Sequence, residues 1–571
     1  DKAASMPCNP SIGGSAKGQM VGEIDAMGGV MGEAADETYL QIKVLNRSRG
    51  PAVQALRTQN DKYEYPKFVQ NKIRSQSGIH VISEEVIDII VKDGHASGVL
   101  TSLGNTYLSK SVVITTGTYL KGMTHIGLAH KNEGRMGEPP SNDLSDALLN
   151  LGFKLGRLKT GTPPRICATS VDFSKMTPQP GDQEFLHFSF RTKDTGRHLN
   201  QHVCYLTNTT PITHEIIKNS LDESPMYSGK ISGKGPRYCP SLEDKIVRFS
   251  DKSSHHLFVE PESLSTSELY IQGFNTSLPI HAQRQILDSI DGLKDSIMLK
   301  PGYAVEYDVV YPNQLNPTLE SKLIHGLFFA GQINGTSGYE EAASQGIVAG
   351  LNASKFSMNE PLEIVSRETS YIGTMIDDLT SKIEMNEPYR MMTARSEYRL
   401  LFRQDNAIFR LSDWAFQHGL LSLSDYDIIK RKKNDFFECL DACKKTNVSN
   451  HAMQKYHIEK IRIDACIRRL NISMDDVLSE FLDKYGKETV DRVITHIRYS
   501  GYIDRQSKQI DVLNRFNSMR IPDSLDYTKI LGLRSESLQK LIHFRPKNIR
   551  EAKSIAGINP ADVMILLAHV R

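Results

Sequence analysis

The stretch GLFFAGQINGTSGYEEAASQGIVAGLNA, at residues 326–353, decides the fold class. Its first residues form a short apolar run that stops at a glycine, as a buried β-strand does. A helix rich in small residues follows and contains Gly338, Gly346 and Gly350. Such a strand–turn–helix unit lets the backbone approach a bound cofactor and points the amino end of the helix at it. An ordinary βα unit packed through small residues is the structural alternative.

A second strand of this kind lies upstream in SVVITTGTY, at residues 111–119. It ends a β-rich region that begins at His80 and contains three apolar runs, HVISEEVIDIIV, ASGVLTSLG and NTYLSKSVVITTGTY. A meander between a dinucleotide half-site and a strand ending in TTG is typical of two-domain FAD flavoproteins. We therefore predict an α/β fold with two Rossmann-like dinucleotide-binding domains, an inserted α/β region and a C-terminal all-helical domain.

One part of this pattern is missing from the sequence. No GxGxxG loop follows a strand near residue 1, although flavoproteins of this class bind the pyrophosphate there. The opening residues, DKAASMPCNP, lack an initiator Met and resemble neither a signal peptide nor a transit peptide. We expect the first strand and its glycine loop to lie in about 40 residues upstream of this sequence. Without them FAD affinity would be poor.

Length and composition set the domain organisation. The 571 residues are 39% hydrophobic and 24% charged, which favours several folded domains and excludes a largely disordered chain. No apolar run reaches the roughly 18 residues of a membrane helix. Seven cysteines without paired spacing indicate a reducing compartment. We predict an FAD-binding domain at 1–160 and 300–355, an inserted NAD-binding α/β region at 161–299, and a helical domain at 356–571.

Charge is unevenly distributed along the chain. Residues 401–571 hold 29 Lys and Arg against 22 Asp and Glu, whereas residues 1–400 hold 40 against 45. A basic carboxyl-terminal part suggests a polyanionic partner, with nucleic acid as the first candidate. A solvated helical surface with a modest excess of lysine would give the same counts.

Two cysteines are candidates for chemistry. Cys8 precedes Asn-Pro, next to a glycine-rich run with Lys17 that could bind an anion but is not a P-loop. Cys239 lies between two prolines in GPRYCPSLEDKIVRF, where Arg237 could favour its thiolate. A buried structural thiol is the alternative for both. The sequence has no HExxH, GxSxG or CxxC motif and no histidines at metal-ligand spacing, so we expect no metal.

Three arginines recur every four residues in EPYRMMTARSEYRLLFRQDNA. On a helix Arg395, Arg399 and Arg403 would form one cationic face, which suits phosphate groups of RNA. Glu397 and Asp405 could instead pair with them and make a salt-bridged structural helix. Both interpretations stay open at this point.

Eight long motifs share one pattern: CNPSIGG, KVLNRSRGPAVQALRTQNDKYEY, GRLKTGTPPRI, SPMYSGKISGKGPRYCPSLEDKIVRF, PGYAVEYD, LFFAGQINGTSGYEEAASQG, EPYRMMTARSEYRLLFRQDNA and FRPKNIREAKSIAGINPADVMILLAHV. Together they resemble the MnmG family, also called GidA, of FAD-containing tRNA uridine 5-carboxymethylaminomethyl modification enzymes. The resemblance runs nearly end to end. It departs from the family at the absent N-terminal strand and glycine loop.

The resemblance implies several site residues. Val86, Ser141 and Gln332 match contacts to FAD in the family. Cys8 and Cys239 match the family's two cysteines and are the candidate catalytic residues. A continuous run resembles the NAD-binding segment: Gly235, Pro236, Arg237, Tyr238, Cys239, Pro240, Ser241, Leu242, Glu243, Asp244, Lys245, Ile246, Val247, Arg248 and Phe249.

The resemblance also implies a reaction and its partners. Family members are homodimers that form a heterotetramer with the GTPase MnmE and act on tRNA, here in a bacterial cytoplasm, a mitochondrion or a plastid. The helical C-terminal part would contact both partners. NADH reduces FAD, methylenetetrahydrofolate supplies a one-carbon unit, and glycine or ammonium supplies the nitrogen added at C5 of the wobble uridine. Thiolate addition at C6 would make C5 nucleophilic, which gives Cys239 or Cys8 a role.

Two other functions stay open. A folate-dependent tRNA uridine methyltransferase is a related flavoprotein, although the segment at 235–249 and the long helical region argue against it. A non-catalytic RNA-binding factor with a degenerate flavoprotein fold would explain the missing glycine loop. The mass of the product would separate the first, and the full-length gene sequence would decide the second.

Overall fold

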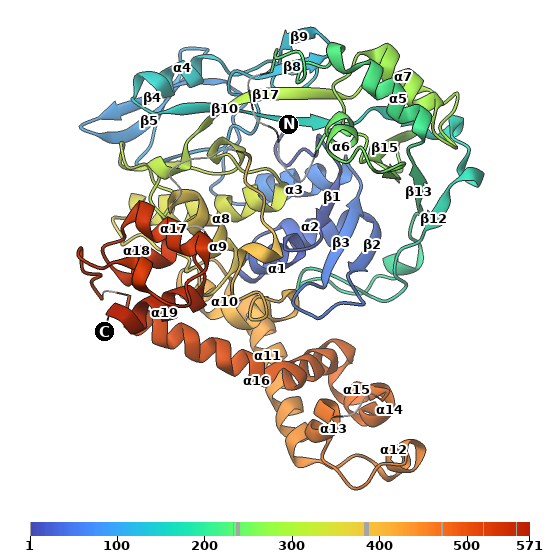
Figure 1. The fold of residues 1–571 in the computed structure, drawn as a ribbon, viewed down its shortest axis with the longest axis vertical. Coiled ribbons are helices and arrows are strands. Elements are labelled where there is room, and N and C mark those ends of the chain that lie inside the picture. Colours follow the sequence, from blue (N-terminus) through green and yellow to red (C-terminus); the bar gives the residue numbers. More distant parts are fainter. Residues whose placement is uncertain are drawn as a thin grey trace. The chain divides into compact units, whose positions relative to one another are not determined.

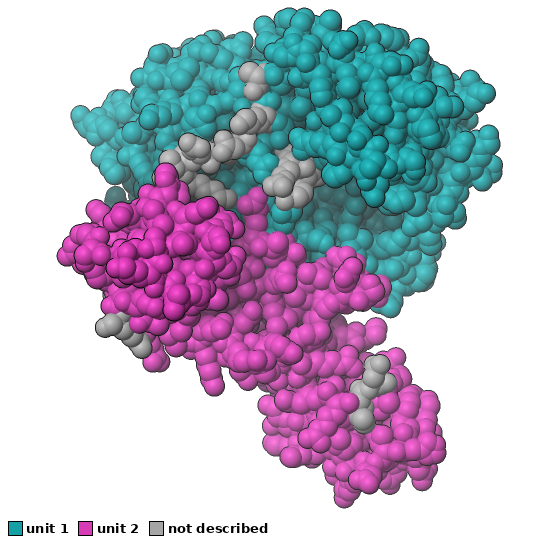
Figure 2. All heavy atoms as spheres, viewed as in Figure 1, with its two compact units in different colours: residues 1–25, 29–45, 55–392 teal, residues 26–28, 46–54, 393–571 magenta. Residues whose placement is uncertain are grey.

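The computed structural model describes residues 2–231, 233, 235, 240–381, 387–469, 472–517, 519–555 and 557–570. They form two compact units, coloured separately in Figure 2. Unit 1 contains residues 1–25, 29–45 and 55–392, and unit 2 contains residues 26–28, 46–54 and 393–571. The continuous carboxyl-terminal segment of unit 2 begins at Thr393.

The strand–turn–helix predicted from 326–353 is confirmed in unit 1. Strand β18 (Leu327–Phe329) is fully buried and pairs in parallel with β7 (Val112–Ile114). The short turn η6 (Gln332–Asn334) leads into the long helix α8 (Tyr339–Ser357). This helix is labelled α8 in Figure 1. Parallel pairing brings the carboxyl ends of both strands to one edge.

The predicted meander is also confirmed, with one difference. Strands β4 (Val86–Lys92), β5 (His95–Thr101) and β6 (Thr106–Leu108) form an antiparallel three-stranded sheet. The third apolar run is not a single strand, because β6 stays in the meander while β7 leaves it to pair with β18. Helix α4 (Asp143–Asn150) contacts β4.

Unit 1 contains two further antiparallel sheets outside the inserted region. Strands β10 (Leu155–Thr162), β17 (Tyr303–Val310), β8 (Met123–Ile126) and β9 (Ala129–Asn132) form an antiparallel sheet in that order. A smaller sheet orders β1 (Ser11–Gly13), β3 (Ala55–Asn60) and β2 (Tyr39–Leu45). Helices α1 (Lys17–Ala26), α2 (Met31–Thr38) and α3 (Glu64–Ser75) accompany the smaller sheet along the chain.

The inserted region is a helix-covered antiparallel sheet. Its strand order is β12 (Thr177–Gln179), β13 (Cys204–Asn208), β14 (His256–Pro261), β15 (Glu268–Gln272), β11 (Arg165–Cys167) and β16 (Met298–Lys300). Helices α5 (Pro211–Asn219), α6 (Leu242–Arg248) and α7 (Ile280–Asp288) share its core. Buried Ile217, Ile246, Leu257, Ile271 and Ile286 join the helices to the sheet.

Two buried carboxylates hold a long loop of this region. Asp36 accepts the backbone amides of Phe188 and Ser189, both at 2.8 Å, and the hydroxyl of Thr192 at 2.6 Å. Asp25 accepts the amide of Phe190 at 2.9 Å. Burial raises the pKa of Asp36 to about 7 and that of Asp25 to about 6.

Removing this clamp has a defined expected result. Asp36→Asn keeps the size but places an amide N–H₂ against N–H donors, so we expect the free energy of unfolding to fall by about 2–4 kcal/mol. Because the folded-state pKa values exceed the ordinary value of 3.8 for an aspartate, wild-type stability falls as pH rises from about 4 to 7. Thermal melts across this range should show a shallower fall in the variant. An equal slope in both proteins would contradict the clamp.

Unit 2 is helical in the part that the structure describes. It contains α10 (Ala407–Gln417), α11 (Leu423–Lys445), α12 (Asn450–Tyr456), α13 (Ile463–Arg469), α14 (Met474–Val477), α15 (Ser479–Tyr485), α16 (Lys487–Arg515), α17 (Ser535–Phe544), α18 (Ile549–Ser554) and α19 (Pro560–Val570). Helix α9 (Tyr371–Ser381) precedes them and belongs to unit 1. Cys439, Cys443 and Cys466 are buried in a hydrophobic core of unit 2, which fits structural thiols. None of the described helices combines the length and apolar character needed to cross a bilayer.

Candidate functional site

The carboxyl ends of β7 and β18 meet at a pair of turns. A Cβ added to Gly117, after β7, would lie 3.9 Å from Gln332 Oε1, after β18. Gly331 has a φ of 90°, which favours glycine, and its amide donates to Gln345 of α8 at 3.2 Å. The buried Oγ1 of Thr116 has no hydrogen-bond partner in the described structure. This edge is where parallel α/β proteins bind ligands.

The amino end of α8 lies next to this edge and carries a buried ion cluster. Its N-cap, Gly338, gives no side-chain cap. Lys17 Nζ lies 2.8 Å from both Glu340 and Glu341, and Glu340 accepts the Gly13 amide at 2.7 Å. Burial opposes the charge of Lys17, but the two carboxylates outweigh it and raise its pKa.

The three glycines of this helix region have different environments. A Cβ on Gly338 would collide with Lys17 Nζ and the Glu341 carboxylate, so glycine is needed there to seat the ion cluster. Apart from their chain neighbours and the nearby backbone of their own helix, Gly346 and Gly350 have no described atom within 4 Å of a Cβ position. Close packing within the described chain therefore does not explain these two glycines.

Cys8 lies at the same helix end. Its backbone amide donates to the hydroxyl of Tyr339, the first residue of α8, at 3.1 Å. Its thiol sulfur lies 3.2 Å from the Tyr270 hydroxyl of β15. The Cys8 side chain is half-buried, so the alternative of a fully buried thiol does not hold for this residue. The fold brings Cys8 to the first residue of α8 although the two residues are 331 positions apart in the chain.

Arg165 gives this corner a fixed positive charge. Its guanidinium donates to Glu262 at 2.9 Å and to the carbonyl of Pro7 at 2.9 Å. It also lies 4.9 Å from the Tyr270 ring centroid. Burial opposes the charge of Arg165, but the Glu262 carboxylate outweighs it and raises its pKa.

Of the three residues matched to FAD contacts, Ser141 and Gln332 lie at the turns after β7 and β18, and Val86 lies in the meander. The Ser141 amide donates to Tyr119, in the turn after β7, at 2.8 Å. Gln332 begins η6, after β18. Val86 begins β4 and pairs with Thr101 in the meander. Their roles with FAD stay predictions.

The described part of the predicted NAD segment is a capped helix. Ser241 accepts the Asp244 amide at 3.1 Å in a capping box that starts α6, a signal visible in SLED. Glu243 is buried, and Lys245 donates to the Gly273 carbonyl at 2.8 Å. Pro236, Arg237, Tyr238 and Cys239 lie outside the described residues. NAD binding and the Cys239 hypothesis stay predictions.

The helix expected around Arg395, Arg399 and Arg403 is not formed. Short 3₁₀ turns at Thr393–Arg395 and Gln404–Asn406 flank an irregular turn. Arg403 is 2% exposed and donates to Asp405 at 2.8 Å, whereas Arg399 is exposed. The four-residue spacing therefore gives no single cationic face, because Arg403 is buried and pairs with Asp405, two residues away, in an irregular turn.

This burial changes what an arginine substitution should do. We expect Arg403→Gln to lower the free energy of unfolding by about 1–3 kcal/mol, since Asp405 loses its partner. The slope of tRNA affinity against salt should not change, because no phosphate contact is lost. Thermal melts and binding titrations at several salt concentrations measure both. A normal melting temperature with a slope reduced by about one would place Arg403 on phosphate instead.

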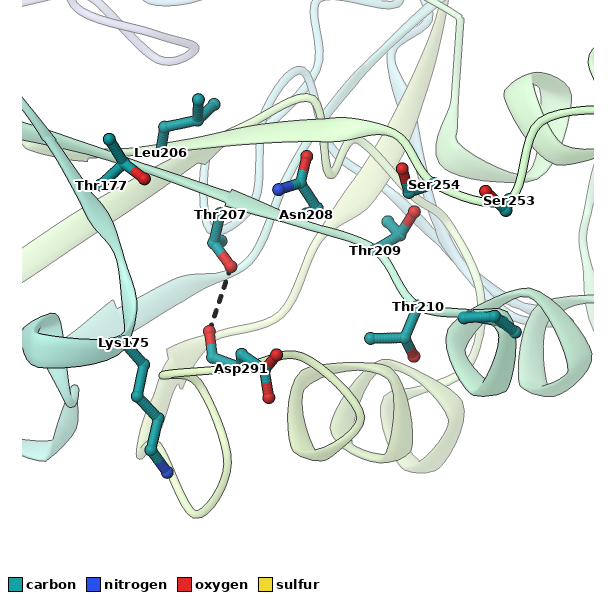
Figure 3. Close-up of a pocket in the computed structure, with 11 residues that line it drawn as sticks. Lys175, Thr177, Leu206, Thr207, Asn208, Thr209, Thr210, Ser253, Ser254 and Asp291 are labelled. Atoms are coloured by element: carbon teal, nitrogen blue, oxygen red, sulfur yellow. Dashed lines mark hydrogen bonds between the residues drawn. The ribbon is translucent and has the colours of Figure 1, made fainter.

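A separate pocket of about 330 Å³ lies between the end of β13 and the start of α5 (Figure 3). Thr207 donates across it to the Asp291 carbonyl at 3.1 Å. Hydroxyl groups make up most of its polar lining. The lining residues are Lys175, Thr177, Leu206, Thr207, Asn208, Thr209, Thr210, Pro211, Ser253, Ser254 and Asp291. None of these residues belongs to β7, β18 or α8, so the pocket is not part of the dinucleotide-type edge. Among the described residues no cluster of side chains fits a metal ion.

A parallel strand pair that ends at glycine turns and the amino end of a long helix defines a dinucleotide-binding α/β protein. Comparisons with known proteins identify the family. The model of "Glucose inhibited division protein A" matches residues 1–361. Two models described as the C-terminal helical domain and helical bundle of the tRNA modifying enzyme MnmG/GidA match residues 424–507 and 509–571. The chain belongs to the MnmG/GidA family.

Individual relatives agree with this assignment. The tRNA uridine 5-carboxymethylaminomethyl modification enzymes MnmG of Lactobacillus johnsonii and Exiguobacterium sibiricum are 44% and 46% identical, each over 100% of this chain and 92% of the relative. Two crystal forms of Aquifex aeolicus GidA superpose with TM-scores of 0.85. They are 42% and 43% identical and align over 100% of this chain and 92% and 94% of those chains.

Proposed function

We propose that this protein is a flavin-dependent tRNA modification enzyme that adds a carboxymethylaminomethyl group to C5 of the wobble uridine. The observation that carries this proposal is the contact of Cys8 with Tyr339 at the amino end of α8, the helix that follows β18. The family assignment and the names of its relatives support the reaction. The relatives named above are bacterial, which favours a bacterial cytoplasm over an organelle.

The residues at the edge fit FAD. Gly117 and Gly331 place no side chain in the turns after β7 and β18, so a ligand can approach the backbone there. The unpaired Thr116 hydroxyl offers a hydrogen bond that no described protein group takes. The uncapped amino end of α8 favours electron-rich groups. Thr116, Ser141, Gln332 and the first turn of α8 would hold the cofactor. FAD would supply two-electron chemistry between NADH and a one-carbon unit from methylenetetrahydrofolate.

The protein's own part in the reaction centres on Cys8 and its neighbours. Uracil C5 is a weak nucleophile until a thiolate adds to C6. Tyr270 positions the Cys8 sulfur through its hydroxyl, and the Arg165 guanidinium lies over the ring of the same tyrosine. The target base must leave the anticodon stack to reach this corner. A homodimer acting with an MnmE-type GTPase, and tRNA contacts from unit 2, complete the proposal.

The rival function is a folate-dependent uridine methyltransferase, and one reaction separates the two. Protein expressed from its complete gene is mixed with FAD, NADH, methylenetetrahydrofolate, glycine, an MnmE-type GTPase and hypomodified tRNA. We expect the mass of the wobble uridine to rise by a carboxymethylaminomethyl group. A bare methyl group would support the rival. Tight tRNA binding with no product and no flavin reduction would support a non-catalytic factor.

A further inference from the structure

A buried polar cluster lies on one face of the sheet that contains β10, β17 and β8. Lys159 of β10 and Glu306 of β17 are direct partners across the antiparallel pair, so their side chains share this face. Glu306 accepts the Gly233 amide at 2.6 Å and lies 3.8 Å from His125 Nε2 of β8. Lys159, Glu306 and His125 are each at least nine-tenths buried.

Glu243 and Ser277 complete the cluster. One oxygen of Glu243, in the first turn of α6, accepts the Ser277 amide at 3.2 Å. Both residues are almost fully buried. Burial raises the pKa of Glu243, while the nearby charge of Lys159 acts in the opposite direction. The cluster thus unites residues from the four-stranded sheet, from α6 and from the segment before α7.

Three atoms of this cluster are buried without a hydrogen-bond partner in the described structure. They are His125 Nε2, Glu243 Oε2 and Ser277 Oγ. Nearly all buried polar groups in native proteins pair with protein, water or a ligand. Three unpaired atoms in one cluster therefore indicate a polar ligand that would complete their bonds.

The charges of the cluster define the kind of ligand. Lys159 and Arg157 bring positive charge, and Glu243 and Glu306 bring negative charge near them. A small zwitterion complements this set, with its carboxylate toward Lys159 and its ammonium toward the two glutamates. Arg157, whose side chain is 26% exposed, lies 3.4 Å from Glu306.

The names of the relatives specify a 5-carboxymethylaminomethyl group, and its nitrogen and carboxymethyl carbons form the skeleton of glycine. We propose that His125, Lys159, Glu243, Ser277 and Glu306 form the site that binds glycine as the amine donor. This assignment rests on the proposed function. It gives a role to buried charges that the thiol chemistry of Cys8 does not use.

A competition between two amines tests the site. The holoenzyme with FAD and its GTPase partner modifies tRNA in the presence of both glycine and ammonium chloride, and mass spectrometry gives the ratio of the two products. Ammonium supplies the same nitrogen without a carboxylate. We expect Lys159→Met to lower the glycine-derived fraction relative to the ammonium-derived one at least tenfold. The matched control is Lys154→Met, whose exposed lysine precedes β10.

A second variant guards against misfolding of the first. The Ser277 hydroxyl has no hydrogen bond to lose, so Ser277→Ala should keep the melting temperature and still lower the product ratio about threefold or more. Equilibrium dialysis of radiolabelled glycine reads the site without the reaction. We expect saturable binding to the wild type and loss of binding in Lys159→Met.

An unchanged product ratio and unchanged glycine binding in a folded Ser277→Ala or Lys159→Met protein would overturn the assignment. An equal fall of both products would also overturn it, because Lys159 would then serve a step common to both amines. Saturable glycine binding by a wild type that makes neither product would support the site while counting against the proposed function.

Discussion

Cys8→Ser should reduce formation of the modified nucleoside by roughly 10³-fold or more, because a hydroxyl of far higher pKa cannot supply the thiolate for C6 of the uridine. The variant should retain FAD, accept electrons from NADH and bind tRNA. Saturating tRNA should not restore the rate, since the loss lies in the chemical step. Single-turnover assays with mass spectrometry of the nucleosides measure this result.

Two other cysteine variants make the result specific. Cys167, at the end of β11, is also half-buried, and Cys167→Ser should leave product formation within about twofold of the wild type. Cys239→Ser tests the second candidate in the same assay. Near-normal product from Cys8→Ser together with loss in Cys239→Ser would transfer the nucleophile role to Cys239.

Lys17→Met should destabilise unit 1 by about 3–5 kcal/mol, because Glu340 and Glu341 would stay buried without their shared cation. Since this ion cluster sets the first turn of α8, we expect flavin content to fall together with stability. Denaturant titration followed by flavin absorbance after reconstitution measures both effects.

A matched lysine provides the control for this variant. Lys67 forms an exposed ion pair with Glu64 on α3, and Lys67→Met should change stability by less than about 1 kcal/mol. If the free energy of unfolding of Lys17→Met changed as little as that of the control and the variant kept its flavin, the ion cluster would not organise the cofactor edge.

Local patterns predicted the parts of the fold that local sequence controls. The apolar run before Gly331 and the small residues after it specified β18 and α8, because burial and helix propensity act within a few residues. The prediction that the third apolar run forms a single strand of the meander was wrong, because it forms β6 and β7 in two different sheets. Alternation of side chains identifies strands but not the sheet that each one joins.

The candidate site depends on contacts that no local pattern contains. Cys8 stood out as a motif, yet its neighbours Tyr270 and Tyr339 come from β15 and α8. The arginine spacing predicted a helix that is not formed, although the pairing of Arg403 with Asp405, two residues away, was one of the alternatives in the sequence. Lys159, Glu243 and Glu306 carry no recognisable spacing, and only the register of β10 with β17 brings two of them together.

The proposal of wobble-uridine modification can be tested most directly by the mass of one nucleoside. The gene is expressed in bacteria that lack their own MnmG, and the tRNA is digested and analysed by mass spectrometry. We expect 5-carboxymethylaminomethyl-type uridine to reappear at the wobble position with the wild-type protein and not with Cys8→Ser. Unmodified or 5-methylated uridine from a well-expressed, flavin-loaded wild type would contradict the proposal.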